Sequence, residues 1–256
     1  MVVQAHSPRV YRRRRQRVRR LLFFLLTVVA LFYFIHSGFF SLENIEITGN
    51  KYIPTAELEN LIGVARGINL WQVDTAAIAK RLATHPLVAK ARVSRRWPRT
   101  LAVQIEERTP VAILVQDGSF LLVDGSGVVM ERIPRIGHLQ LPLISGLGKL
   151  ENTGPGREIN HAGLQAALAV IRQMPPGDLN QLQEIIASSP VNLQLIWAGN
   201  ILVKFGDGQQ VAEKFSRLHE ALQGLAGREA VDYIDVSFAG APVVKFNQPE
   251  KQGKKG

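Results

Sequence analysis

The sequence contains no cysteine among its 256 residues. This absence excludes disulfide scaffolds, zinc sites with thiolate ligands, iron–sulfur clusters and cysteine nucleophiles. Acidic residues are missing from the first 20 positions, although the whole chain carries 21 Asp and Glu against 31 Lys and Arg. The basic surplus is therefore distributed unevenly along the chain.

Most of the net charge of +10 lies at the N-terminus. Eight arginines fall within the first 20 residues: Arg9, Arg12, Arg13, Arg14, Arg15, Arg17, Arg19 and Arg20. Residues 21–256 carry 23 basic and 21 acidic side chains and are nearly neutral. A nucleic-acid-binding fold gathers Lys and Arg on a folded surface, so we expect no nucleic-acid partner for the body of the protein.

A long uncharged run follows the arginines. Residues 21–42 include no Asp, Glu, Lys or Arg, and about 20 helical residues cross the roughly 30 Å hydrocarbon core of a bilayer. A cleaved signal peptide is the alternative, because it also places a basic segment before an apolar one. Phe39 and Phe40 are bulky where a signal peptidase requires small side chains, so we predict an uncleaved transmembrane helix over 21–42.

The orientation of this helix follows from its flanks. Residues 1–20 form a basic tail, whereas the 20 residues after the run hold one Lys and four Glu. The positive-inside rule therefore predicts a cytoplasmic N-terminus and an exported C-terminal region. The arginines could also bind anionic lipid headgroups or nucleic acid, but we interpret them as a determinant of topology.

Residues 43–110 have the pattern of a small α+β domain. Alternating apolar residues predict strands on either side of two short helices, with Asp74 as the N-cap of the second helix. The turn Trp97-Pro98-Arg99-Thr100 separates the last two strands. The predicted order is βααββ, a three-stranded sheet with two helices on one face.

Two sequence stretches in this region resemble a known family. The ITGN at 47–50 and the stretch ARVSRRWPRTLAVQIEERTPVAIL at 91–114 are similar to the POTRA domain of the bacterial cell division FtsQ/DivIB family. That family also has a short basic cytoplasmic segment and one transmembrane helix, so the resemblance covers essentially the whole chain. It implies a POTRA domain over 43–110 followed by a β domain over 111–247.

The pattern of residues 111–247 agrees with such a β domain. Turns containing Asp-Gly pairs separate alternating apolar runs and predict hairpins. Helices are expected at 161–174 and 209–225, the second with an apolar stripe typical of a core-facing helix. We therefore expect a mostly antiparallel sheet with two helices, and a disordered tail at 248–256, which is rich in Gly and Lys.

The sequence shows no motif or residue cluster typical of an active site. The six histidines are scattered without metal-ligand spacing, and no GxSxG, P-loop or GxGxxG motif is present. Glu106 and Glu107 are adjacent, so on a strand they point to opposite faces. We expect a non-enzymatic protein without a metal or cofactor. The alternative is a membrane-anchored, exported cell-wall hydrolase, which would need clustered carboxylates or a metal site in a cleft.

The last strands carry the first predicted binding site. A final strand often lies at a sheet edge, where free backbone groups can accept a strand from another chain. The resemblance implies that an FtsB-like segment, or DivIC in relatives, docks there. Phe238, Val244 and Phe246 match the positions concerned, and the strand from Val243 to Phe246 would supply the backbone pairing. Packing of Phe238 and Phe246 in the core is the alternative.

A second predicted partner site is the basic and aromatic turn that contains Arg96 and Trp97. POTRA domains in general contact protein partners, and the alternative is a turn fixed by packing of the tryptophan. The resemblance further implies a scaffold of the division complex at the septum, associated with FtsB-like and FtsL-like proteins. A POTRA-bearing outer-membrane transporter is excluded, because the residues after Arg108 are too few for its barrel.

Overall fold

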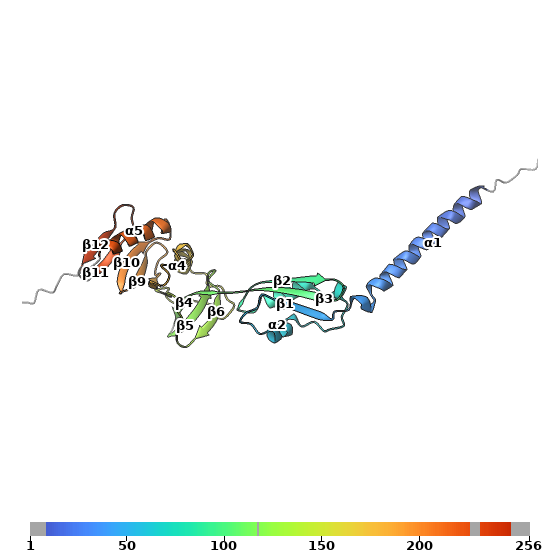
Figure 1. Cartoon of the computed structure of the whole chain (residues 1–256), viewed down its shortest axis with the longest axis horizontal. Coiled ribbons are helices and arrows are strands. Elements are labelled where there is room, and N and C mark those ends of the chain that lie inside the picture. The colour runs from blue at the N-terminus through green and yellow to red at the C-terminus, as the bar shows by residue number, and fades with distance from the viewer. Residues whose placement is uncertain (1–8, 117, 226–230, 247–256) are drawn as a thin grey trace, which may run out of the picture. The chain divides into compact units, whose positions relative to one another are not determined.

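The structure is a computed structural model that describes residues 9–116, 118–225 and 231–246, with side chains described from residue 17 onward. The chain divides into two compact units (Figure 1). The first contains residues up to 83 together with 90–106, and the second contains 84–89 and the residues from 107 onward. The predicted disordered tail at 248–256 lies outside the described residues.

The first unit starts with the apolar helix α1, Arg9–Ile35. Its segment Arg17–Ile35 is long and apolar enough to span a membrane, with a mean hydropathy of 2.1. The helix begins inside the arginine tail, which includes the backbone of Arg12, Arg13, Arg14 and Arg15, and ends seven residues before the predicted position 42. The side chains of these four arginines lie outside the described part of the chain.

The earlier end of α1 has a clear cause in the residues that follow. Ser37 caps a short 3-10 helix, η1, Gly38–Phe40. Leu42 is fully buried in the first unit, and its amide and carbonyl are hydrogen-bonded to the backbone of Ile68 and Gly67. The last apolar residues of the run thus belong to the folded domain, which corrects the predicted end of the helix.

The first unit has the predicted βααββ order. Its elements are β1 Asn44–Thr48, α2 Thr55–Ile62, the 3-10 helix η2 Leu70–Gln72, α3 Thr75–Leu82, β2 Val88–Arg96 and β3 Thr100–Glu107. The strand order is β1-β3-β2, and β1 runs parallel to β3. Buried side chains from the helices meet those of the sheet in the core: Leu58, Ile62, Ile78, Leu82, Leu101, Val103 and Ile105.

Local signals in the sequence explain where these elements start and end. The Asp74 carboxylate accepts hydrogen bonds from the amides of Ala76 and Ala77, which confirms it as the N-cap of α3. Gly49, in the ITGN stretch, has a φ of 89°, and a Cβ there would lie 2.0 Å from the Ile105 carbonyl oxygen. Only glycine fits at this close approach between β1 and β3.

The second unit is built on a nine-stranded sheet with two helices. Its elements are β4 Pro110–Gln116, β5 Ser119–Asp124, β6 Val129–Ile133, β7 Leu143–Ser145, α4 Ala162–Gln173, β8 Leu182–Ile186, β9 Leu193–Trp197, β10 Ile201–Gly206, α5 Val211–Gly224, β11 Val231–Asp235 and β12 Val243–Phe246. The strand order is β12-β11-β10-β9-β8-β7-β4-β5-β6. Most neighbouring pairs are antiparallel, as predicted, while β10–β11, β4–β7 and β7–β8 are parallel.

The core of the second unit lies between this sheet and its helices. The stripe of α5 is confirmed: Val211, Phe215 and Leu218 are buried, and Phe215 contacts Phe205 with ring centroids 5.3 Å apart. Strand β8 lies between β7 and β9 and was not predicted. Its alternation of apolar and polar residues is short and lies directly before a loop.

Candidate protein-interaction surfaces

The last strand, β12, lies at one end of the nine-stranded sheet. It pairs with β11 in antiparallel register, with Val243 opposite Asp235 and Val244 opposite Ile234. Within the described part of the chain, no strand pairs with its other side. The predicted edge position of the C-terminal strand is therefore present in the fold.

The hydrogen-bond pattern of β11 tells which backbone groups of β12 face this edge. The amide of Val236 donates to Lys204 of β10 at 3.0 Å. Amides alternate in direction along a strand, so Ile234 also faces β10 whereas Asp235 faces β12. In an antiparallel pair, two residues that lie opposite each other either exchange both backbone hydrogen bonds or exchange none. Val243 is thus bonded to β11, and the backbone of Val244 points to the open edge.

The side chains of β12 alternate between the core and solvent. Val244 packs against the hydrophobic core, opposite the buried Ile234, and Phe246 shares its face. Val243 is 47% exposed. Of the two predicted aromatic anchors, Phe246 therefore lies on the core side of the strand, whereas Phe238 lies in the preceding loop and is 45% exposed.

The loop that carries Phe238 is held by polar contacts. The Arg217 guanidinium of α5 donates hydrogen bonds to the carbonyl oxygens of Phe238 and Gly240. The Asp235 carboxylate accepts hydrogen bonds from the amide and hydroxyl of Ser237, at 3.0 and 2.6 Å. These contacts position the exposed ring of Phe238 next to the start of β12.

The solvent face of this edge carries cations around one tyrosine. The ammonium of Lys204 lies 3.7 Å from the centroid of the Tyr233 ring, and that of Lys245 lies 5.4 Å from it. Lys245 also forms an ion pair with Asp232 at 2.7 Å. The hydrogen bond to Asp232 raises the pKa of Lys245 above its usual value, which makes the charged form of this lysine still more favoured.

The second predicted surface, the turn between β2 and β3, has its cations paired within the first unit. Arg95 donates to the carbonyl oxygens of Leu70 and Val73, at 2.9 and 2.6 Å. Arg96 pairs with Glu46, and Arg99 pairs with Glu43. The turn is basic in sequence, but its positive charges are largely paired in the fold with groups from distant parts of the chain.

Trp97 in this turn packs against aromatic rings of other segments. Its ring centroid lies 4.4 Å from that of Trp71 in η2 and 5.6 Å from that of Phe40. Trp97 nevertheless remains 43% exposed. The packing of the tryptophan, which was the alternative to a partner site, is thus present, and contact of this turn with a partner stays a prediction. Trp71 was not identified from the sequence, because nothing local links it to a turn 26 residues later.

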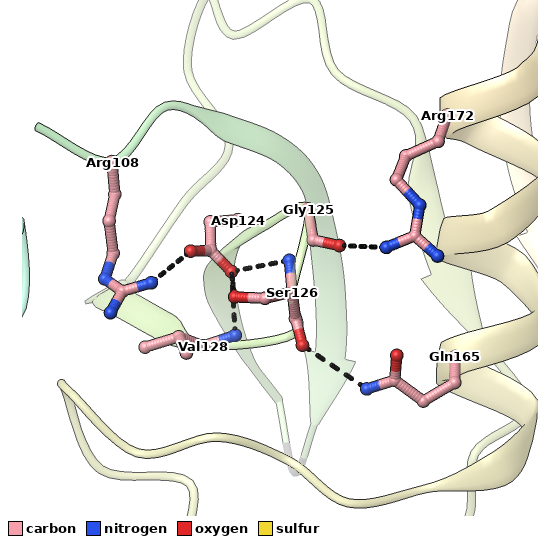
Figure 2. A network of polar contacts seen from close by, with 7 residues as sticks. All are labelled: Arg108, Asp124, Gly125, Ser126, Val128, Gln165 and Arg172. Atoms are coloured by element: carbon pink, nitrogen blue, oxygen red, sulfur yellow. Dashed lines mark hydrogen bonds and ion pairs between the residues drawn. The ribbon is translucent and has the colours of Figure 1, made fainter. Parts of the chain in front are cut away.

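Apart from these two surfaces, a polar network fixes the turn that begins at Asp124, at the end of β5 (Figure 2). The Asp124 carboxylate accepts hydrogen bonds from the Ser126 hydroxyl at 2.7 Å and from the amides of Ser126 and Val128, and it pairs with Arg108. Burial by itself would raise the pKa of Asp124, but these contacts together lower it below its usual value. The pair Asp124-Gly125 thus lies in a turn between two antiparallel strands, as predicted for the Asp-Gly pairs.

Helix α4 closes this network from the other side. Arg172 donates to the carbonyl oxygen of Gly125 at 2.8 Å, and Gln165 donates to that of Ser126 (Figure 2). Every contact of the Asp124 turn is thus made inside the second unit. The network therefore fixes the conformation of this turn.

The titratable side chains of the described residues are mostly scattered. No group of three or more His, Asp or Glu there is placed to hold a metal ion. His219 pairs with the mostly buried carboxylate of Asp178 at 2.8 Å. This two-residue contact joins α5 to the segment before β8.

Comparison with known proteins agrees with the order of these units. The profile of the POTRA domain, FtsQ-type, matches residues 40–108, and that of the cell division protein FtsQ/DivIB C-terminal region matches residues 112–237. The class defined by the fold is therefore a POTRA-bearing protein with one N-terminal apolar helix that anchors it to a membrane.

Several cell division proteins are similar to this chain over most of its length. The chain is 31% identical to the cell division protein FtsQ of a Geobacter species, covering 80% of this chain and 75% of the relative. It is 27% identical to the FtsQ protein of Syntrophotalea carbinolica, covering 85% and 78%. It is 34% identical to that of Mycolicibacterium smegmatis, of which it spans 57%. The chain belongs to the FtsQ/DivIB family of cell division proteins.

Proposed function

We propose that this protein is a non-enzymatic scaffold of the division complex, which accepts a strand from a partner at the edge formed by β12. The partner class is an FtsB-like or DivIC-like division protein, with an FtsL-like protein in the same assembly. The observation that carries the proposal is the open side of β12 in the nine-stranded sheet.

The chemistry of this edge suits an added strand. A strand docks through backbone hydrogen bonds, and alternate side chains supply specificity. The backbone of Val244 points outward, while its side chain stays in the core. Val243, in the same strand, and Phe238, in the loop before it, both expose apolar surface. Phe246 supports the strand from the core side, so we assign it a structural contribution to the site.

The topology of the anchor completes the proposal. The arginines before the apolar segment, among them Arg17, Arg19 and Arg20, favour a cytoplasmic N-terminus by the positive-inside rule. Both folded units would then lie outside the cytoplasm, where they would act at the division septum. Binding of a partner to the turn at Arg96 and Trp97 stays a prediction.

The experiment measures binding of synthetic peptides that together cover an FtsB-like partner to the full-length protein in detergent. Val244→Pro removes an amide that points to the edge and leaves the bonds of Val243 to β11 in place. We expect it to abolish measurable binding. Phe238→Ala should weaken binding about tenfold, which corresponds to roughly 1.4 kcal/mol for one apolar anchor.

Two controls separate binding from folding. Val191→Ala truncates a valine that is 69% exposed in another loop of the same unit, and it should leave the affinity unchanged. Thermal unfolding of Val244→Pro shows whether the unit still folds. Hydrogen exchange of wild-type protein should show new protection at Val244 on binding. Unchanged affinity of a folded Val244→Pro protein would exclude strand addition at β12.

A further inference from the structure

A cluster of aromatic side chains connects the end of α1 to the POTRA domain. Consecutive ring contacts join Phe34, Phe39, Phe40, Trp71 and Trp97. The centroid distances are 5.6 Å for Phe34–Phe39, 5.1 Å for Phe39–Phe40 and 4.4 Å for Trp71–Trp97. We call this cluster the aromatic shelf.

The aromatic shelf remains half open although its rings contact one another. Phe39 is 48% exposed, Trp71 is 50% exposed and Trp97 is 43% exposed. Ile68, two residues before η2, adds further exposed apolar surface. A contiguous apolar patch of this kind marks an interaction site, so the shelf requires an occupant.

The position of the shelf along the chain indicates that occupant. Phe39 lies four residues after Ile35, the last residue of α1, and four residues span at most about 14 Å. The Asn69 amide nitrogen donates to the Ile35 carbonyl oxygen at 2.7 Å, and Arg99 donates to the Phe39 carbonyl oxygen at 3.2 Å. The shelf is therefore held next to the point where α1 leaves the bilayer.

The polar surroundings of the shelf also suit a membrane surface. The three cations nearest to Trp97 in sequence all have partners within the first unit. Arg96 and Arg99 pair with Glu46 and Glu43, and Arg95 donates to backbone carbonyl oxygens. Trp is enriched at membrane interfaces, where its apolar ring enters the bilayer and its N–H stays near the headgroups. Because these charges are already paired, the rings can approach the apolar part of the interface without bringing an unpaired cation with them.

We propose that the aromatic shelf inserts into the bilayer interface at the C-terminal end of α1, with Trp71 and Trp97 at the level of the lipid headgroups. The shelf thereby fixes the POTRA domain against the membrane. This inference rests on anchoring of the chain by α1, and it is independent of the strand addition proposed for β12.

The three tryptophans of the chain allow a direct test. Trp197 is buried in the second unit, so a Trp197→Phe protein reports only on the shelf. This full-length variant is reconstituted in phosphatidylcholine–phosphatidylglycerol vesicles whose acyl chains are brominated either near the headgroup or near the methyl end. We expect lipids brominated near the headgroup to quench its emission strongly, and lipids brominated near the methyl end to quench it weakly.

Two further variants make the outcome unambiguous. Trp71→Phe with Trp97→Phe leaves only Trp197, which should not be quenched by either lipid. Tyr33→Trp, in a background with all three tryptophans replaced by Phe, reports on α1 itself and should be quenched. If Tyr33→Trp is quenched while Trp71 and Trp97 respond only to aqueous acrylamide, the shelf proposal fails and a protein occupant takes its place. If Tyr33→Trp is also unquenched, anchoring by α1 fails as well.

Discussion

The β12 edge and the aromatic shelf differ in the kind of group that each leaves open. At the β12 edge, the side chain of Val244 is packed in the core while its backbone points outward. At the shelf, Arg95, Arg96 and Arg99 are paired, while the rings of Trp71 and Trp97 remain half exposed. Open backbone groups suit another strand, and open rings suit an apolar environment.

Both surfaces are held by an arginine that donates to backbone carbonyl oxygens. Arg95 fixes η2 and thereby Trp71, and Arg217 fixes the loop of Phe238. The two arginines therefore allow the surfaces to be weakened one at a time. The effects of substitutions at these surfaces can be compared with those of substitutions in the Asp124 network, whose contacts lie inside the second unit.

The largest expected loss of stability comes from a substitution in the Asp124 network. Asp124→Ala removes a carboxylate that holds Ser126, Val128 and Arg108, and leaves the Arg108 guanidinium mostly buried without its counter-charge. We expect a loss of about 3 kcal/mol in the free energy of unfolding at neutral pH. Ser126→Ala, which removes one hydroxyl donor, should cost about 1 kcal/mol. Urea denaturation measures both, and equal losses would contradict the assigned charge pair.

The Asp124 network also has a defined pH dependence. The pKa of Asp124 is lowered in the folded protein, so its contribution is fully present above the unfolded pKa of about 3.9. This contribution should decline as the pH falls through the lowered folded value. The difference in unfolding free energy between wild type and Asp124→Ala should shrink over this acidic range. A difference that grows as the pH falls would reverse the assigned sign.

Arg95→Ala should have the next largest effect and should act on the shelf. It removes the donors to Leu70 and Val73, whose carbonyl oxygens then lose their partner. We expect a loss of about 1–3 kcal/mol in stability, together with weaker quenching of Trp71 by brominated lipids. Arg95→Lys should restore only part of the stability, because one ammonium replaces a guanidinium fork. Peptide binding at β12 should be unchanged.

Arg217→Ala should have a smaller effect on stability and should act on the β12 edge. The arginine is only partly buried, so its loss lets water reach the carbonyl oxygens of Phe238 and Gly240. We expect about 1 kcal/mol in unfolding free energy and a several-fold weaker affinity for the peptide, measured by calorimetry. Normal peptide affinity in this variant would show that the loop conformation does not contribute to the site.

The smallest effect is expected at an exposed ion pair of the turn. Arg96→Ala breaks the contact with Glu46, and both side chains are largely exposed. Such pairs contribute about 0–1 kcal/mol, so thermal unfolding should shift little. Glu46→Ala serves as the matched control, since it breaks the same pair from the other side. A loss as large as that of Arg95→Ala would mean that the two arginines are equivalent.

Local signals predicted much of the fold, while contacts between distant segments were beyond their reach. The N-cap at Asp74 and the helix stripe with Phe215 depend on neighbours within a few turns, and both are confirmed. The apolar run from Leu21 to Leu42 could not show that its last residue packs in a domain core, because both environments favour the same side chains.

The same limit applies to the candidate sites. The edge position of β12 follows from its place at the end of the folded sequence. That Val244 faces the core while its backbone faces outward depends on register with β11 and β10. Likewise, the basic turn looked open because Glu43 and Glu46 lie about 50 residues away from their arginines. Exposure of a turn can be predicted locally, but pairing of its charges cannot.

The hydrogen bond from Asn69 to the last carbonyl oxygen of α1 has a consequence for how partners meet this protein. A long flexible tether would let a domain take almost any orientation and would lower the effective concentration of its binding surface. Here the helix passes into the domain through a short 3-10 turn and a direct bond to Ile35. With α1 as the membrane anchor, the POTRA domain would therefore meet other molecules at the membrane in a restricted orientation.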